Sequence, residues 1–240
     1  RANNMYAPYS DYIYPFTDLT ETGLTGPLVL AWQSLYNVIQ QSNRVIIGTN
    51  GSPVEETKKR QYVAEARFMR GVAYWYLASL WGDVIISEDP KVLVNNPIVN
   101  KNPRKDVYEF VIRDLEYAAK YLPATSSQGG RSGGRLTKYS AYGMLSRIYL
   151  AYAGLSDNPN SGARSAEYLE LAKKAAQKVI TESEYKLLTS YASLFTIENN
   201  NNTESLFALQ WVPNGEYGVT NTQQAYFACD SEITGDAGAW

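Results

Sequence analysis

Apolar residues recur at spacings of three and four along most of the chain, and this pattern predicts amphipathic helices. In the second predicted helix the apolar residues form two stripes, so this helix should be buried between its neighbours. The pattern predicts five helices, over about residues 28–47, 52–80, 103–122, 137–154 and 165–182.

Start and stop signals support these boundaries. Ser52, Pro53 and Glu55 are typical of an N-cap, a first-turn proline and a capping-box acid. Glycine or proline ends each of the first four predicted helices, at Gly48, Gly82, Pro123 and Gly154, and both residue types commonly end helices. Between and after the helices, the sequence predicts a short helical turn at 191–195, a strand at 206–212, and irregular structure at 1–27, 83–102, 124–134 and 213–240.

A weak internal similarity relates two of the predicted helices. RFMRGVAYWYLASLWG and YSAYGMLSRIYLAYAG place Gly71 and Gly143 at matching points, and Gly82 and Gly154 keep the same offset of 72 residues. That offset is close to two tetratricopeptide-type helix pairs of about 34 residues each. A glycine in each helix would allow a neighbour to approach closely. The alternative is that two buried helices resemble each other only in composition.

Composition excludes several classes of function. The net charge is −2 with acids and bases interleaved, which argues against nucleic acid or anionic lipid as the main partner. Histidine is absent and Cys229 is the single cysteine, so neither a histidine-dependent catalytic pair nor an internal disulfide can form. No apolar run reaches the ~20 residues of a membrane span, and residues 1–240 contain no signal-peptide pattern.

No motif for catalysis, a cofactor or a metal stands out. The glycines of residues 129–134 lack the Lys-Ser/Thr that a phosphate-binding loop requires. The carboxylates form no recognisable pair for glycoside hydrolysis. Arg67, Arg70 and Arg147 lie on helices predicted to be buried, where they should serve as ion-pair or carbonyl partners. We therefore predict a protein that is not an enzyme, with no cofactor and no metal.

The aromatic content points towards binding. The chain has 20 Tyr and 5 Trp, whose flat apolar faces and polar edges suit sugar rings. Irregular segments on a rigid scaffold are where binding residues tend to lie. Packing of the loops onto the helices is an equally good explanation of these rings. Rings gather in two irregular segments, as Tyr6, Tyr9, Tyr12, Tyr14 and Phe16 near the start and Trp211, Tyr217, Tyr226, Phe227 and Trp240 near the end.

Several runs together resemble one family. WQSLYNVIQQSNRVI at 32–46 is similar to the first helix of SusD-like proteins, and AEARFMRGVAYWYL at 64–77, followed by LWGDV, resembles their most recognisable stretch. Ile85 stands where that family usually has proline. Further similar runs follow in family order at 107–115, 134–150, 168–187 and 202–210. On these residues the chain resembles the N-terminal part of the SusD/RagB outer-membrane nutrient-binding lipoproteins.

The resemblance implies a fold and a function. The fold would be mostly α, with tetratricopeptide-like helix pairs forming a right-handed superhelix, irregular aromatic-rich loops and little β structure. The protein would be a cell-surface lipoprotein, held to the outer membrane by a lipidated cysteine upstream of this chain. It would bind an oligosaccharide without cleaving it and deliver it to a SusC-like TonB-dependent transporter. The alternative is a peptide-binding or scaffold protein of a nutrient-uptake complex.

The resemblance also implies how the chain is divided. Residues 1–27 would be an aromatic-rich loop segment, 28–198 the helical repeat, and 199–240 the start of an irregular ligand-binding region whose continuation is missing. Family binding residues fall in loops ahead of the first helix and after the strand. The candidate ligand-binding residues are therefore Tyr6, Tyr9, Tyr12, Trp211, Tyr226 and Trp240.

Overall fold

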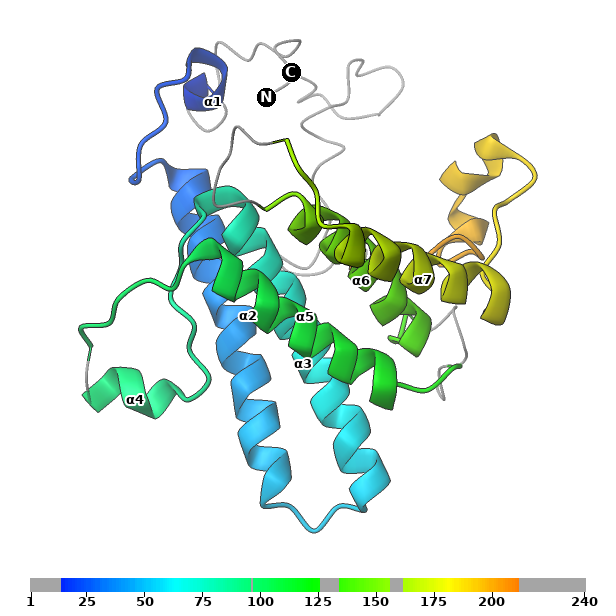
Figure 1. Ribbon diagram of the computed structural model, residues 1–240, viewed down its shortest axis with the longest axis horizontal. Coiled ribbons are helices and arrows are strands. Elements are labelled where there is room, and N and C mark those ends of the chain that lie inside the picture. The colour runs from blue at the N-terminus through cyan, green and yellow to red at the C-terminus, as the bar shows by residue number, and fades with distance from the viewer. Residues whose placement is uncertain (1–13, 96, 126–133, 156–161, 212–240) are drawn as a thin grey trace.

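The computed structural model describes residues 14–95, 97–125, 134–155 and 162–211 (Figure 1). Within these ranges the chain forms seven α-helices and two short 3-10 helices, so the mostly helical fold is confirmed. The helices are α1 (Tyr14–Asp18), α2 (Gly26–Asn50), α3 (Glu56–Trp81), α4 (Pro90–Asn95), α5 (Arg104–Tyr121), α6 (Lys138–Ala153) and α7 (Ala166–Glu182), followed by η2 (Tyr191–Phe195) and η3 (Ile197–Asn199).

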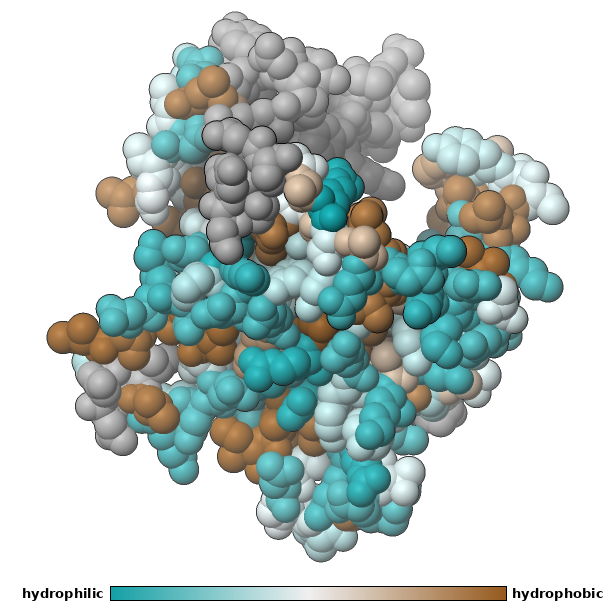
Figure 2. Space-filling model, in the orientation of Figure 1, coloured by the Kyte–Doolittle hydropathy of each residue, from teal (hydrophilic) through white to brown (hydrophobic). Residues whose placement is uncertain are grey.

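The long helices stack in chain order. α2 packs against α3, α3 against α5, α5 against α6, and α6 against α7, which is the arrangement of successive helix pairs (Figure 1). α3 and α6 are thus the second helices of two neighbouring pairs. The offset of 72 residues therefore spans one helix pair lengthened by long connections, and its interpretation as two 34-residue repeats is wrong. The connection that carries α4 projects from the stack and exposes apolar residues (Figure 2).

The core lies around α3, which is covered on two faces as the double stripe predicts. Phe68, Tyr74 and Leu77 of α3 are fully buried, as is Leu115 of α5. At Gly71 a β-carbon would lie 3.4 Å from the side chain of Leu115, which is an ordinary contact distance, so α3 and α5 pack closely here without requiring a glycine. One continuous apolar cluster joins α2, α3, α5, α6 and α7.

Side chains close the helix ends, with one difference from expectation. Thr137 and Ser140 form a capping box at the start of α6, and Gly82 ends α3 with a φ of 77° that favours glycine. The predicted cap of α3 at Ser52 is wrong, because the carboxylate of Glu55 accepts the N–H groups of Thr57 and Lys58. A carboxylate that binds two first-turn donors defines the start of the helix more strongly than the Ser52 hydroxyl.

Three local predictions failed. α1 lies in a segment expected to be irregular, and α4 lies in an expected loop, because helices of five and six residues are too short to show a period. The strand predicted at 206–212 is absent from its described residues, 206–211. The only β pairing in the described ranges is a bridge between Val84 and Asn102. None of the helices described combines the length and apolar content that a membrane crossing requires.

Candidate ligand-binding surface

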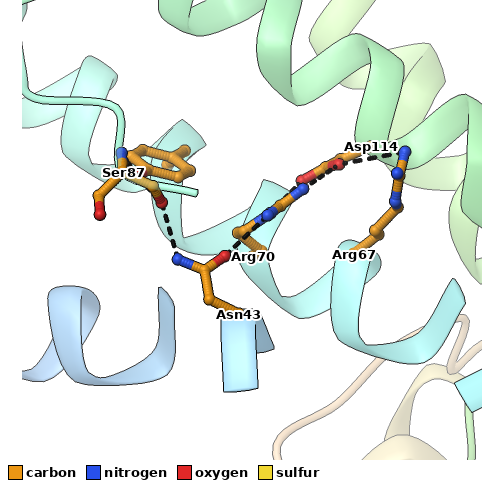
Figure 3. Close-up of polar contacts among 6 residues, drawn as sticks. Asn43, Arg67, Arg70, Ser87 and Asp114 are labelled. Carbon is orange, nitrogen blue, oxygen red and sulfur yellow. Dashed lines mark hydrogen bonds and ion pairs between the residues drawn. The ribbon is translucent and has the colours of Figure 1, made fainter. Parts of the chain in front are cut away.

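A buried polar network fixes the scaffold beneath the surface (Figure 3). Arg70 of α3 donates two hydrogen bonds of 2.8 Å to the carboxylate of Asp114 on α5 and one of 2.7 Å to Asn43 of α2. Asn43 in turn donates to the carbonyl of Ser87, at 2.7 Å. Arg67 lies 3.8 Å from the same carboxylate. The ion-pair roles predicted for Arg67 and Arg70 are confirmed.

The segment after α3 is held by tyrosine hydroxyls as well. Tyr36 of α2 donates to the Ile85 carbonyl at 2.9 Å and accepts the Ile85 N–H at 3.1 Å. Tyr74 of α3 accepts the Ser87 N–H at 2.8 Å. Burial raises the pKa of Tyr36 to about 12, against the opposing effect of its backbone hydrogen bond. The segment is therefore anchored to two helices by neutral hydroxyl groups.

Residues 203–211, which we call the strap, cross the outer faces of α3 and α6. The ring of Phe207 contacts the ring of Phe68 edge to face, with centroids 5.1 Å apart. Leu206 lies over Gly143 so closely that a β-carbon at position 143 would be 2.8 Å from its Cδ1 atom. Gly143 thus allows the strap, rather than a neighbouring helix, to approach α6.

Hydrogen bonds hold both ends of the strap. Thr203 forms two with Lys186, of 3.0 and 2.8 Å, and Glu204 accepts the Leu188 N–H at 2.6 Å. Near the other end, the side-chain amides of Gln210 and Asn201 are joined by two hydrogen bonds, of 2.8 and 3.0 Å. These hydrogen bonds attach the strap to residues 186–188 and to Asn201, up to the residue before Trp211.

A glycine makes room for the end of the strap. Gly134 has a φ of 66°, in the region that favours glycine, and a β-carbon there would lie 2.5 Å from the side chain of Gln210. Arg135 then donates to both carboxylate oxygens of Glu65 at 2.7 and 2.8 Å. The 134–136 segment is thereby joined both to the strap and to α3.

Two grooves flank the strap. The larger, about 740 Å³, runs between α2, α3 and the strap, and Tyr62 on its wall is 43% exposed. The smaller, about 430 Å³, lies over α3 and α6. In it Trp75 contacts Tyr76 with ring centroids 4.7 Å apart, and the guanidinium of Arg147 lies 5.0 Å from the Trp75 ring. Arg147 is therefore exposed and stacked, and its prediction as a buried ion-pair or carbonyl partner is wrong.

Of the six candidate residues, the structure describes Trp211. It follows Gln210 at the end of the strap and is 48% exposed, so its ring is accessible to a ligand. The other five, Tyr6, Tyr9, Tyr12, Tyr226 and Trp240, lie outside the described residues. Their roles remain predictions from the sequence.

Sequence reasoning missed the rings that line the grooves. Tyr62, Trp75 and Tyr76 lie on α3, whereas the search for binding rings was confined to irregular segments. The signal that could have found Tyr62 and Tyr76 is a ring beside the buried stripe, whereas Trp75 belongs to the second predicted stripe and packs against the core. The buried stripes themselves hold Phe68 and Tyr74.

The carboxylates near these surfaces are engaged within the protein. Glu65 pairs with Arg135, and Glu204 accepts the Leu188 N–H at 2.6 Å. In the ranges that the structure describes, no group of three or more acidic or cysteine side chains could hold a metal ion. Exposed rings beside amides and charged groups suit non-covalent binding.

Comparison with known proteins gives consistent matches. A family model described as "Starch-binding associating with outer membrane" matches residues 9–150. A SusD-like protein of Bacteroides ovatus is 41% identical over the whole chain, which covers 43% of that protein. The starch-binding protein SusD of Bacteroides thetaiotaomicron is 27% identical over 82% of the chain, and the match covers 33% of that protein.

The chain is also similar to proteins of known structure. A crystal structure with a xylogluco-oligosaccharide is similar to the whole chain with a TM-score of 0.87 and 39% identity, and the chain covers 46% of it. A laminarin-binding SusD-like protein has the same fold, with a TM-score of 0.68 over 80% of the chain. The chain spans less than half the length of these relatives.

Proposed function

This chain belongs to the SusD-like family, and from that premise we propose that its protein captures an oligosaccharide at the cell surface and passes it to a SusC-like TonB-dependent transporter. Proteins of this family bind carbohydrate without catalysis and associate with the outer membrane. The expectation that the protein is not an enzyme agrees with its family. Anchoring by a lipid upstream of the chain and delivery to the transporter belong to the proposal.

The observation that carries the proposal is a likeness to a protein solved with a sugar. That structure, 39% identical over the entire chain, holds a xylogluco-oligosaccharide, so a glucan-based oligosaccharide is the ligand class we propose. Trp211 supports it, because the strap presents a half-exposed ring next to the Gln210–Asn201 amide pair. A flat ring stacked on a sugar should contribute about 1–2 kcal/mol to binding, by analogy with other aromatic contacts.

Isothermal titration of the full-length protein with a xylogluco-oligosaccharide and with maltoheptaose tests the ligand class. We expect binding of the former in the micromolar to millimolar range. Trp211→Ala should weaken it about ten-fold, because the stacking ring is lost. Tyr191→Ala is the matched control, since this ring is 77% exposed on η2 and lies outside the strap.

The outcomes separate the parts of the proposal. If titration with a broad panel of glycans gives no heat of binding, the oligosaccharide hypothesis is wrong, and the peptide-binding or scaffold alternative is favoured. Equal binding by Trp211→Ala and Tyr191→Ala would remove Trp211 from the site and leave the function standing. Delivery is tested by affinity purification from outer membranes, in which a TonB-dependent transporter should accompany the tagged protein.

A further inference from the structure

A separate groove lies on the opposite side of α6 from the strap contacts, between α5 and α7. Both helices pack on α6 rather than on each other, so α6 forms the floor between them (Figure 1). The groove measures about 330 Å³. It is lined by Glu116, Ala119 and Lys120 of α5, Tyr142, Leu145 and Tyr149 of α6, and Leu171, Lys174, Ala175 and Lys178 of α7.

The rim of this groove is positive although the chain as a whole carries a net charge of −2. The one acid that lines it, Glu116, already accepts the hydroxyl of Tyr149 at 2.6 Å. Lys178 is bound to Glu182 at 3.1 Å. Among the described residues, Lys120 and Lys174 form no ion pair, and the ammonium of Lys120 lies 5.1 Å from the Tyr121 ring. The two ammonium groups, on opposite walls, therefore have no carboxylate partner within the described residues.

The floor of the groove is apolar. Leu145 is almost fully buried and Ala175 is 5% exposed, and Leu171 adds a further aliphatic surface. Figure 2 shows hydrophilic residues over α5 and α7 on this face, with apolar atoms between them. A partner that fills the groove would thus place an apolar group on the floor and anions at the rim.

The chemistry of the lining favours a peptide over a sugar. Sugar hydroxyls are recognised by amide and hydroxyl side chains, and in the described part of the chain this groove is lined by no Asn, Gln, Ser or Thr. Of its two phenols, that of Tyr149 is taken by Glu116. A large apolar side chain between acidic ones would match both the floor and the lysines.

We propose that the groove between α5 and α7 binds a short acidic peptide segment of a partner protein, with an apolar side chain seated on α6 and carboxylates at Lys120 and Lys174. This inference is independent of glycan binding, because the strap and Trp211 take no part in it. It holds whether or not an oligosaccharide is the ligand elsewhere.

Fluorescence polarisation with a fluorescein-labelled peptide of sequence DEWED tests the proposal on the full-length protein. We expect saturable binding that weakens about ten-fold between low and physiological salt, because exposed charges are screened. The isosteric peptide NQWQN should bind about ten-fold or more weakly, since it lacks the carboxylates. Equal binding of the two peptides, or no binding of either, would overturn the proposal.

Two neighbouring lysines provide a matched pair of variants. Lys174→Glu reverses a charge in the groove, whereas Lys173→Glu makes the same change on α7 outside the lining, at a residue 72% exposed and 3.8 Å from Glu170. Lys174→Glu should weaken DEWED about ten-fold, and Lys173→Glu at most about two-fold. Equal losses would show only long-range charge attraction and refute the site. Binding of oligogalacturonate in place of DEWED would likewise refute a peptide site.

Discussion

The α2–α3–α5 core and the strap hold their shapes by different means. In the core, Arg70 and Asp114 are each 2% exposed and form a bidentate ion pair. Arg70 also donates a hydrogen bond to Asn43. The strap lies at the surface, and its place depends on two glycines, Gly134 and Gly143, that leave room for its side chains. Buried polar groups therefore hold the core together. The strap can lie against its neighbours because the two glycines beneath it have no side chains.

Because of this difference, we expect the core to keep its conformation and the strap to change its conformation more easily. A buried charge without its partner is strongly unfavourable, so the core depends on Arg70 and Asp114 remaining paired. The strap has exposed hydrogen bonds and few fully buried groups, which is typical of segments that open locally at low free-energy cost. A rigid helical core that carries an adjustable strap at its surface suits the capture of an extended ligand.

The largest effect should come from breaking the buried pair. Arg70→Ala leaves the Asp114 carboxylate buried without its main partner and should lower the free energy of unfolding by about 3–5 kcal/mol. Urea denaturation followed by circular dichroism measures it. Arg60→Ala removes an exposed pair with Glu56, at 3.4 Å on the same helix, and a contact with the Tyr121 ring at 5.5 Å, and should cost at most about 1 kcal/mol. Similar losses in the two variants would contradict the distinction between core and surface.

A smaller effect is expected where the strap ends. Gly134→Ala places a β-carbon at a φ of 66° and 2.5 Å from Gln210, so the amide pair with Asn201 should separate. The cost should be about 1–3 kcal/mol. Gly51→Ala is the control, because a β-carbon there meets nothing within 4 Å and its φ is −93°. Thermal unfolding of both variants measures the difference, and equal melting temperatures would contradict the role of Gly134.

Substitution of the two matching helical glycines, Gly71 and Gly143, compares the core with the strap directly. Both Gly71→Ala and Gly143→Ala should gain about 0.5–1 kcal/mol of helix propensity. At position 71 the β-carbon meets Leu115 at 3.4 Å, which is tolerable, whereas at 143 it meets Leu206 at 2.8 Å. Gly143→Ala should therefore be about 1 kcal/mol less stable than Gly71→Ala. Its strap amides should also exchange hydrogen faster, and identical exchange in the two variants would refute the contact.

The sequence predicts the helices well because their signal is local. α2, α3, α5, α6 and α7 all lie within a few residues of the predicted ranges, since three- and four-residue spacings report the buried face directly. The strap could not be predicted in this way. LFALQWV suggests a strand, but in the structure its apolar residues pack on Phe68 and Gly143, far away in sequence, and no strand lies beside it in the described ranges.

The candidate sites depend even more on distant residues. Trp211 was found because it lies in a loop with other rings, whereas Tyr62 and Trp75 were passed over as helical residues. The lysines between α5 and α7 come from helices separated by more than 40 residues, and only the stacking on α6 brings them to one groove. No spacing within a single helix signals that arrangement.

The smallest effect should appear at alkaline pH. The pKa of Tyr36 is raised to about 12 in the folded protein, so the unfolded chain ionises first, near pH 10. The stability that this hydroxyl contributes is complete below pH 10 and is lost as the pH rises towards 12. Discounted for partial exposure, the loss at pH 11 should be about 0.5 kcal/mol.

Tyr36→Phe lacks the hydroxyl group. The difference between its free energy of unfolding and that of the wild type should therefore shrink between pH 9 and pH 11 in urea titrations. A Tyr36→Phe difference that stays constant or widens would show that burial of this hydroxyl does not anchor the segment after α3.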